Sequence, residues 1–309
     1  MELMFFSILV NCVTLSLSVP DHTAAFFPNV KGNLTAITWA HAVNSQALLQ
    51  TALNGSVMML EADVIIGTLN NEPDPIPIMG HPPANNSDLS LEMFLQAVQN
   101  NNMNSSAPKG IKLDFKSIEA VEKSSPIIGK MYPAITFPLW LNADILPGPL
   151  NTVDPPVDAA RFLKVAETFA NATLSIGWKT LYGGPANITN ASYTDQQIEE
   201  MINVIRFHNV TQPITFPVRA GIAAQSLEQL DKIVKSVNDS TLTLWNGNGD
   251  YVDIPTLREL IFRLGVNKVY VDLPDDLKMS LHLDQNGSVS NLASITVLAF
   301  ILSLLVTLM

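Results

Sequence analysis

Two hydrophobic periods alternate along most of this chain. Short runs rich in β-branched and aromatic residues are each followed by a stretch in which apolar residues recur at i, i+3, i+4 and i+7, the spacing of one helix face. Eight such runs are predicted to be strands: 37–42, 57–66, 110–116, 134–141, 173–179, 213–219, 241–245 and 267–273. The helical pattern is plainest in 158–170, 195–208 and 226–237, and Ser226 with Gln229 predicts a capping box for the last of these.

These alternations fill residues 30–277 without a Gly/Ser-rich linker, so they predict a single α/β domain, a (β/α)8 TIM barrel. An open doubly wound sheet is the alternative. Such a sheet usually carries a Gly-rich phosphate turn after its first strand, and the sequence contains no G-x-G-x-x-G, P-loop or G-x-S-x-G motif. The Asn- and Pro-rich segments 70–88 and 147–156 are then expected to be loops over one face of the barrel.

The N-terminal end resembles a processing signal. Residues 4–17 are mostly apolar, and the run closes on Ser16 to Ser18, where small residues precede an expected cut near Val19. We therefore predict a signal peptide at 1–18. A buried first helix is the alternative, because the segment before the apolar run contains Glu2 and no Lys or Arg.

The C-terminal end is also apolar. Residues 292–309 carry no charge, and no Lys or Arg follows Lys278. A spanning helix normally needs basic residues on its cytoplasmic side to stop transfer, so a chain that ends inside the apolar run favours a GPI-attachment signal. A C-terminal membrane anchor is the alternative, since the spacer before the tail is short. The candidate attachment residues in the linker 278–291 are Asn286, Gly287, Ser288 and Ser290.

Composition narrows the classes of partner. The chain has 28 acidic and 17 basic residues and a formal charge of -11, so it lacks the dense basic stripe that binds nucleic acid. The single cysteine, Cys12, lies in the predicted signal, so the mature chain depends on its core rather than on disulfides.

Asn-x-Ser/Thr acceptors for N-glycosylation occur ten times, which predicts a glycoprotein of the secretory pathway. We expect it at the extracellular face of the plasma membrane or in the extracellular space. The acceptors are Asn33, Asn54, Asn85, Asn104, Asn171, Asn187, Asn190, Asn209, Asn238 and Asn286.

Polar residues gather where the first three predicted strands end, which in a barrel is the site of function. His41 ends the first strand, Glu61 and Asp63 lie on the second, and Asp114 lies on the third. Residues i and i+2 of a strand point to one side, so two ionised carboxylates there would repel at about 5 Å unless a cation lies between them. Asp114 would add a third oxygen, and an all-oxygen site prefers Mg²⁺, Ca²⁺ or Mn²⁺ to zinc.

Lys116 and His81 complete the predicted site. Lys116 follows Asp114 by two residues and would hold a second anionic oxygen, and His81 lies in the loop after the second strand. One divalent metal, a lysine and two histidines together indicate a phosphodiester site. One histidine would remove a proton from the attacking hydroxyl and the other would protonate the leaving oxygen. The alternative for each histidine is a structural hydrogen bond.

Further candidates lie near later strand ends. Arg219 is expected to face the barrel mouth, since an unpaired guanidinium inside the barrel would be costly. Trp245 is expected to flank a bound head group as an aromatic wall, and packing inside the barrel is the alternative for it and for Trp178. The other two candidates are Asn142 and Asp144.

Four motifs on these strand ends resemble the active-site motifs of the PLC-like phosphodiesterase superfamily, which includes glycerophosphodiester phosphodiesterases and spider-venom sphingomyelinase D. They are HAVN at 41–44, EADV at 61–64, GHP at 80–82 and LDFK at 113–116. The resemblance implies His41 and His81 as the acid/base pair, Glu61, Asp63 and Asp114 as metal ligands, and Lys116 as a phosphate contact.

The superfamily patterns are not matched throughout. Glycerophosphodiesterases usually have Arg and Asp where this chain has Ala42 and Pro82, and Glu where it has Asp114. The sphingomyelinase D branch carries a disulfide-bounded loop that one cysteine cannot form. The substrate class therefore stays open between phospholipids and glycerophosphodiesters.

The span from residue 37 to about 277 is more closely similar to the menorin family. That resemblance implies a second function of a different class, a non-catalytic module that acts with adhesion molecules at cell surfaces during neuronal and epithelial development. The characteristic segments are TWAHAVNS at 38–45, GIKLDFK at 110–116, WLNAD at 140–144 and FPVRA at 216–220.

Overall fold

The computed structural model describes residues 22–150, 152 and 154–284 of the chain. The predicted signal peptide at 1–18, the tail at 292–309 and Asn286 lie outside the described residues. Within the described part of the chain, no helix combines the length and the apolar character that crossing a membrane requires.

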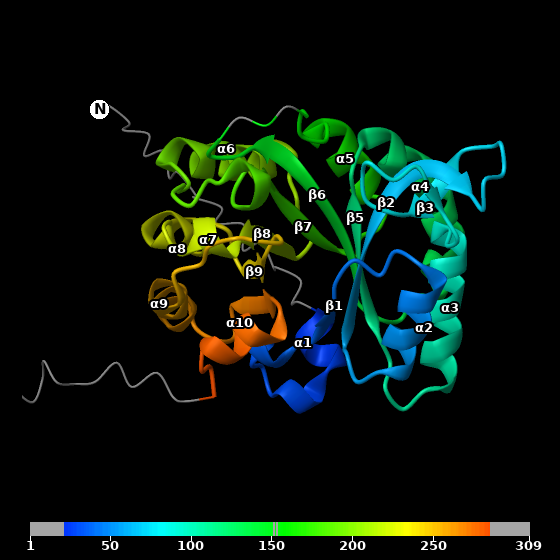
Figure 1. The fold of residues 1–309 in the computed structure, drawn as a ribbon, viewed down its shortest axis with the longest axis horizontal. Coiled ribbons are helices and arrows are strands. Elements are labelled where there is room, and N and C mark those ends of the chain that lie inside the picture. The colour runs from blue at the N-terminus through cyan, green and yellow to red at the C-terminus, as the bar shows by residue number, and fades with distance from the viewer. Residues whose placement is uncertain (1–21, 151, 153, 285–309) are drawn as a thin grey trace, which may run out of the picture.

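Eight parallel strands form one ladder in chain order (Figure 1). The strands are β1 (Trp39–Ala40), β2 (Met59–Leu69), β5 (Gly110–Phe115), β6 (Leu139–Pro147), β7 (Thr173–Lys179), β8 (Ile214–Arg219), β9 (Thr241–Trp245) and β10 (Val269–Asp272). Contacts other than strand pairing bring β10 back to the start of the chain: the Leu34 N–H donates to the Val266 carbonyl at 2.8 Å, and the Trp39 and Tyr270 ring centroids lie 6.3 Å apart. The fold is a nearly closed (β/α)8 barrel, as predicted.

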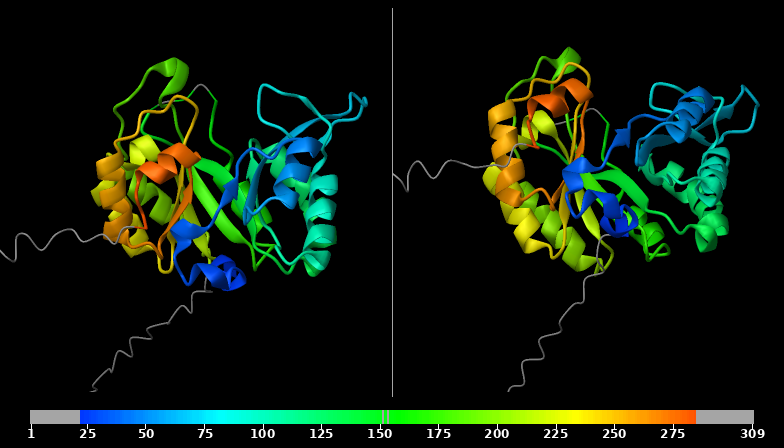
Figure 2. Two further views of the ribbon diagram at one scale, coloured as in Figure 1. Left: turned by 60° about the horizontal axis from the view of Figure 1, so that its bottom comes forward. Right: turned by 90° about the horizontal axis from the view of Figure 1, so that it is seen from below.

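Helices cover the outside of the ladder (Figures 1 and 2). The side-chain oxygens of Ser45, Ser90, Ser117 and Thr194 accept backbone N–H groups at the first turns of four of them, as good N-caps do. The helices are α2 (Gln46–Asn54), α3 (Leu91–Asn104), α4 (Ile118–Met131), α5 (Ala159–Ala166), α6 (Asp195–Phe207), α7 (Ala220–Ala223), α8 (Leu227–Ser236), α9 (Ile254–Leu264) and α10 (Asp275–Ser280).

The capping box predicted at Ser226 and Gln229 is wrong. Ser226 stands at the N-cap of α8, but its side chain makes no capping hydrogen bond. The buried hydroxyl instead donates to the Ile222 carbonyl at 2.8 Å and accepts the Tyr193 N–H at 2.9 Å. One bond is local, to the carbonyl four residues earlier, and one is tertiary; together they satisfy the buried hydroxyl in place of the cap. A capping box does form at α6, between Thr194 and Gln197.

The fourth predicted strand also differs from the prediction, because β6 begins at Leu139 and not near residue 134. Residues Tyr132–Ala134 form a 3₁₀ turn, and the Ile135 N–H donates back to the Tyr132 carbonyl at 3.0 Å. At its other end β6 continues to Pro147, six residues beyond the prediction. This longer course carries Asn142 and Asp144 within the strand.

The segment predicted as a loop at 70–88 contains two short strands, β3 (Ile76–Met79) and β4 (Asn86–Ser87). Both pair with the long upper part of β2, β3 in the antiparallel sense. The Gly80 N–H then donates to the Asp63 carbonyl at 3.0 Å. The excursion therefore returns the chain to the carboxyl end of β2 just before His81.

The opposite end of the barrel is closed by the N-terminal segment. A short helix α1 (His22–Phe26) and two 3₁₀ turns, Pro28–Val30 and Leu34–Ala36, lie beneath the strands (Figure 2). The Trp140 indole N–H donates to the Thr23 hydroxyl at 2.9 Å. The buried apolar cluster at this end consists of Phe27, Val30, Leu34, Ile37, Met59, Trp140 and Tyr270. The strand ends with polar residues are thus left as the open mouth.

Candidate active site at the barrel mouth

Three carboxylates meet at the mouth. Glu61 and Asp63 come from β2 and Asp114 from β5, and the strand register places Asp63 directly beside Asp114. One oxygen from each of the three lies within 4.8 Å of the others. Glu61 and Asp63 are almost fully buried, so their charges are shielded little by water. The predicted cluster is present in the structure.

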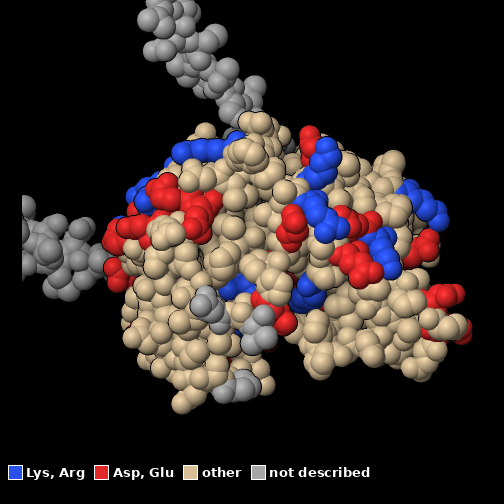
Figure 3. All heavy atoms as spheres, turned by 90° about the horizontal axis from the view of Figure 1, so that it is seen from above, with Lys and Arg blue, Asp and Glu red and all other residues tan. Residues whose placement is uncertain are grey.

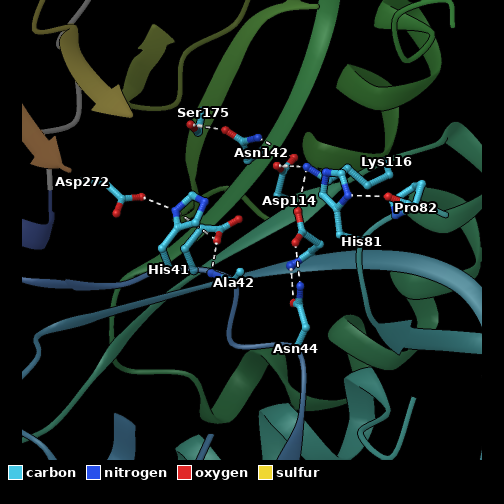
Figure 4. A network of polar contacts seen from close by, with 12 residues as sticks. His41, Ala42, Asn44, His81, Pro82, Asp114, Lys116, Asn142, Ser175 and Asp272 are labelled. Carbon is cyan, nitrogen blue, oxygen red and sulfur yellow. Dashed lines mark hydrogen bonds and ion pairs between the residues drawn. The ribbon is translucent and has the colours of Figure 1, made fainter. Parts of the chain in front are cut away.

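The loop after β1 holds two of these carboxylates in place (Figure 4). Ala42 adopts a positive φ of 55°, and its N–H donates to Glu61 Oε2 at 2.8 Å. Asn44 donates from Nδ2 to Asp63 Oδ2 at 2.7 Å and accepts the Asp63 N–H through Oδ1 at 2.9 Å. The sequence analysis quoted Asn44 only as part of a motif and assigned it no role.

Lys116 lies between the two aspartates. Its Nζ is 2.7 Å from Asp63 Oδ1 and 2.5 Å from Asp114 Oδ2. Burial opposes the charge on Lys116, but the Asp114, Asp63 and Glu61 carboxylates outweigh it and raise the pKa of the ammonium group. For Asp114 burial likewise opposes ionisation, and Lys116 and Lys112 outweigh it and lower the pKa of the carboxyl. The pair is therefore a charged pair at neutral pH.

A line of hydrogen bonds continues across the barrel from Asp114. Asn142 on β6 donates from Nδ2 to Asp114 Oδ1 at 2.6 Å, and Ser175 on β7 donates to Asn142 Oδ1 at 2.6 Å. Asn142, predicted as a further candidate, thus orients one of the carboxylates. Asp144, two residues on, is half-buried, and its desolvation raises its pKa to about 6, with the nearby Asp114 charge adding to the shift.

His41 lies on the other side of the cluster. Its Nδ1 is 3.0 Å from Asp272 Oδ2 and 3.5 Å from Glu61 Oε2, while half of its side chain remains exposed to the mouth. The negative charge of Glu61 raises the pKa of His41 to about 9, against the opposing effect of burial and with support from Asp272. For Glu61, burial and its acidic neighbours raise the pKa to about 7. His41 is therefore protonated at neutral pH.

Asp272 was not selected from the sequence. It is the last residue of β10, and it lies two residues after the interior residue Tyr270, so strand alternation aims it into the barrel. Its position at the end of the eighth predicted strand could have identified it as a candidate site residue. Its distance from His41 is 231 residues along the chain, so only closure of the barrel brings the two together.

Lys112 was also missed. It precedes Asp114 by two residues on β5, is 3% exposed, and pairs in register with Glu61. Its charge acts on His41, Glu61, Asp114 and Asp144. Side chains two residues apart on a strand face the same side, so the argument that placed Lys116 beside Asp114 also applies to Lys112.

The structure places His81 at the rim of the mouth rather than within the cluster. Its Nδ1 lies 2.7 Å from the Pro82 carbonyl oxygen, and the residue is exposed. In Figure 4 the imidazoles of His41 and His81 lie on the two sides of Asp114. Its backbone follows the Gly80 N–H contact with Asp63, so His81 is at neither the bottom nor the helical wall of the barrel. Its role as an acid or base stays a prediction.

Arg219 and Trp245 lie together on the opposite side of the barrel. Asp250 accepts hydrogen bonds from Nε and Nη2 of Arg219 at 2.6 and 2.7 Å, and the guanidinium lies 5.1 Å from the Trp245 ring centroid. Arg219 is therefore a paired cation, and its partner Asp250 was not predicted from the sequence.

The two candidate tryptophans differ in burial. Trp245 is half-buried at the mouth, whereas Trp178 is fully buried and packs against Tyr193 and Phe216. For Trp178 the alternative, packing inside the barrel, is therefore the one found.

The donor set fits a hard divalent cation. All three side chains of the cluster offer carboxylate oxygens, and each oxygen has lone pairs beyond those that accept from Lys116, Asn44, Asn142 and the Ala42 N–H. Figure 3 shows basic and acidic side chains meeting in the hollow on this face. The fold and the site together define a TIM-barrel protein with an acidic, oxygen-rich centre at its mouth.

Comparison with known proteins assigns this barrel to a family. The model described as the Menorin N-terminal domain matches residues 33–278, and Protein FAM151B of Homo sapiens is 37% identical over 238 residues, 77% of this chain and 82% of that protein. The chain belongs to the menorin family.

Solved structures show more distant similarity. A glycerophosphoryl diester phosphodiesterase from Parabacteroides distasonis has a TM-score of 0.45 and 14% identity, covering 82% of this chain and 90% of that chain. N2152 from Neocallimastix frontalis has a TM-score of 0.43 and 11% identity, covering 78% of this chain and 60% of that chain.

Proposed function

We propose that this protein is a divalent-metal phosphodiesterase of the PLC-like type that acts on a phospholipid or glycerophosphodiester. The observation that carries the proposal is the Glu61, Asp63 and Asp114 cluster, with oxygens within 4.8 Å of one another at an open barrel mouth. Mg²⁺ or Ca²⁺ is the expected ion. When bound, it would supply Lewis-acid stabilisation of a phosphoryl oxygen.

The side chains around the cluster have separate tasks in this proposal. Lys116 is a permanent cation beside two ligands and is suited to hold a non-bridging phosphate oxygen. His41 is protonated at neutral pH and half-exposed, so it can deliver a proton to a leaving oxygen. Asp272 fixes the ring through Nδ1 and leaves Nε2 as the reacting atom. His81, across the site, is the proposed proton acceptor.

Head-group recognition is proposed for the other side of the mouth. Trp245 offers a half-buried indole face, and the Arg219 guanidinium beside it is oriented by Asp250. Because the carboxylate of Asp250 already neutralises Arg219, this part of the wall is closer to neutral than the acidic cluster. An aromatic face with low net charge favours a head group with apolar or cationic character.

A direct test uses the full-length protein incubated with sphingomyelin, lysophospholipids and glycerophosphodiesters, with released head groups detected in the presence of Mg²⁺ or Ca²⁺. Chelation of the ion and His41→Asn should each abolish release. The control His282→Asn changes an exposed histidine outside the mouth and should leave release unchanged. Absence of Mg²⁺ and Ca²⁺ binding by calorimetry at millimolar concentration would refute the metal site.

A second candidate function is a non-catalytic cell-surface module that binds adhesion proteins. The observation that favours it is the Lys116 ammonium, which already lies between Asp63 and Asp114 and neutralises part of the cluster. If the wild-type chain binds a divalent cation yet releases no head group from any substrate, the module replaces the enzyme.

The proposed location is the cell exterior. The signal at 1–18 would direct export, and the tail at 292–309 would tether the barrel through a GPI anchor or a membrane helix. Release of the protein from intact cells by a phosphatidylinositol-specific phospholipase would support the GPI form, and retention after that treatment would support the helix.

A further inference from the structure

The nine N-glycosylation acceptors within the described residues are divided unequally between the two ends of the barrel. Asn85, Asn187 and Asn190 lie in loops at the mouth, after β3 and β7. Six others lie at the opposite end, where chain segments lead into strands: Asn33, Asn54, Asn104, Asn171, Asn209 and Asn238. We name this end, formed by the connections into β1, β2, β5, β7, β8 and β9, the lower face.

The lower-face acceptors are accessible. Five of the six asparagines are exposed, and Asn33 is half-buried. The Asn33 side chain uses Oδ1 to accept the Thr35 N–H and hydroxyl, at 3.1 and 2.7 Å. Those bonds involve the oxygen and leave Nδ2, the atom that would receive a sugar. Among the described residues, the only acceptors within wall helices are Asn54 and Asn104, and these are the last residues of α2 and α3. The middle turns of the described wall helices therefore carry no acceptor.

Phe207 supplies a second, independent observation at this face. Its side chain is 80% exposed, the highest value among the exposed large hydrophobic residues that the structure describes. Asn209 follows it by two residues in a left-handed conformation, with a φ of 48°, and Thr211 completes the acceptor motif. An aromatic ring this exposed can bury apolar surface only against something added outside the fold, such as the C–H face of a sugar.

A similar arrangement occurs at a second acceptor. Met103 is 67% exposed and directly precedes Asn104 at the end of α3. Between Asn209 and Asn238 lies a cavity of about 170 Å³ whose lining combines apolar residues such as Ile205 and Val210 with polar ones such as Gln212. Sugars on these acceptors would stand over the exposed apolar side chains and over the rim of the cavity.

We propose that the lower face is the N-glycosylated face of this protein and that the Phe207 ring is the platform for the sugar on Asn209. The inference rests on the export proposed above. In the transfer step, Nδ2 of asparagine bonds to the anomeric carbon of an oligosaccharide carried on a lipid diphosphate. The bond from that carbon to the diphosphate oxygen breaks, the lipid diphosphate leaves, and a base takes the displaced Nδ2 proton.

The placement has a consequence for partners. Hydrated sugars over six lower-face positions exclude protein surfaces from that end of the barrel, including the cavity beside Asn238. The helical wall and the part of the mouth away from the loops of Asn85, Asn187 and Asn190 then remain for substrates and for cell-surface proteins. This leaves the carboxylate cluster accessible from the face opposite the main glycan layer.

The first experiment measures site occupancy on the full chain made in animal cells, by mass spectrometry of glycopeptides. We expect at least four of the six lower-face acceptors to be occupied, with Asn209 among them. A secreted or surface chain without sugar at most of the six overturns the inference and leaves export intact. A chain retained in the cytosol without any sugar refutes export and this inference together.

The second experiment tests the platform with a double-mutant cycle on thermal unfolding. Phe207→Ala should lower the melting temperature of the glycosylated protein by about 2 °C or more. In the Asn209→Gln background the same change should have a clearly smaller effect, because without the sugar the exposed ring keeps only its edge-to-face contact with the His208 ring, 5.0 Å between centroids. Equal shifts in the two backgrounds would show that Phe207 acts within the fold and would overturn its role as platform. Met279→Ala, at another exposed position, is the control.

Discussion

The two ends of the barrel interior differ in character although the same strands build both. At the lower end Trp39, Met59, Trp140 and Tyr270 pack against one another. Two residues further along the same strands or directly beyond them come His41, Glu61, Asn142 and Asp272. Because the side-chain period of a strand is two, both sets face the interior at successive heights. Two residues along each strand thus separate the closed apolar cluster at the lower end, here called the plug, from the charged site at the mouth.

The difference shows how stability and chemistry are divided between the two ends. The lower end is covered by α1 and by the two 3₁₀ turns, and its residues Trp140 and Tyr270 are fully removed from water. The mouth keeps two lysines and several carboxylates buried or nearly so beside a half-exposed histidine, and charges interact strongly there. Substitutions at the lower end should therefore mainly reduce the stability of the fold, and substitutions at the mouth should mainly reduce ligand binding.

The largest expected effect is on stability and comes from the plug. Trp140→Ala removes a fully buried indole and its hydrogen bond to Thr23, and should lower the free energy of unfolding by about 3–5 kcal/mol. Urea unfolding followed by circular dichroism measures it. Trp245→Ala at the mouth should cost less than half as much, because that ring is only half-buried. Equal losses would contradict the proposed division.

The next effect is on cation binding at the mouth. Asp63→Asn removes one carboxylate of the cluster and should weaken Mg²⁺ or Ca²⁺ binding by roughly 100-fold, which is about 2.7 kcal/mol. Isothermal calorimetry is the measurement, and Asp74→Asn, at an exposed position in the loop after β2, is the matched control. If Asp63→Asn retains wild-type affinity, the cluster is not the cation site.

A smaller effect depends on pH and concerns Asp144. Its folded-state pKa of about 6 lies above the usual value of 3.8, so the folded protein prefers the neutral acid. Below pH 3.8 Asp144 is neutral in both the folded and the unfolded protein and does not lower the free energy of unfolding. As the pH rises from there through 6, the unfolded protein ionises first and the folded protein loses stability. Asp144→Asn should raise the free energy of unfolding by about 2 kcal/mol at pH 8.

Chemical unfolding at two pH values tests that sign. At pH 3.5 the Asp144→Asn variant and the wild type should have nearly equal stability. A variant that gains as much stability at pH 3.5 as at pH 8 would show that the effect arises from packing and not from the charge.

The smallest effect concerns the contact that attaches the N-terminal segment to the plug. Thr23→Val keeps the shape of the side chain and removes the hydroxyl that accepts from the Trp140 indole, leaving a buried donor without its acceptor. The expected loss is about 1 kcal/mol. Thermal unfolding should show it, and the cation affinity at the mouth should be unchanged. A change in that affinity would mean that the two ends are coupled.

The fold was predictable because each of its elements has a local signature. Strands β7 and β9 and helix α6 begin at the predicted residues, since buried strands and amphipathic helices differ in their hydrophobic period. The local rule failed for Ser226, whose hydroxyl bonds to the Ile222 carbonyl behind it and to the N–H of the distant Tyr193 instead of capping α8. It also placed the start of β6 too early, where a 3₁₀ turn precedes the first paired residue.

The carboxylate cluster was predictable for a related reason. Glu61 and Asp63 share a side of one strand by alternation alone, and Asp114 follows at the end of the next barrel strand. Asp272 and Asp250 were not predictable as partners of His41 and Arg219, because nothing in a sequence window specifies which distant carboxylate will approach a given cation. Lys112 could have been predicted by the same strand alternation that identified Lys116.

The sequence by itself determined the order of strands and helices, the side of each strand that faces the interior, and the residues able to carry charge at the mouth. These follow from the two backbone periods and from the free energy of burying apolar surface. Only the tertiary structure decided that Asp272 meets His41, that Lys116 lies between two aspartates, and that most of the described glycan acceptors lie at one end. Those outcomes depend on strand register and barrel closure, which are set by contacts between residues far apart in the chain.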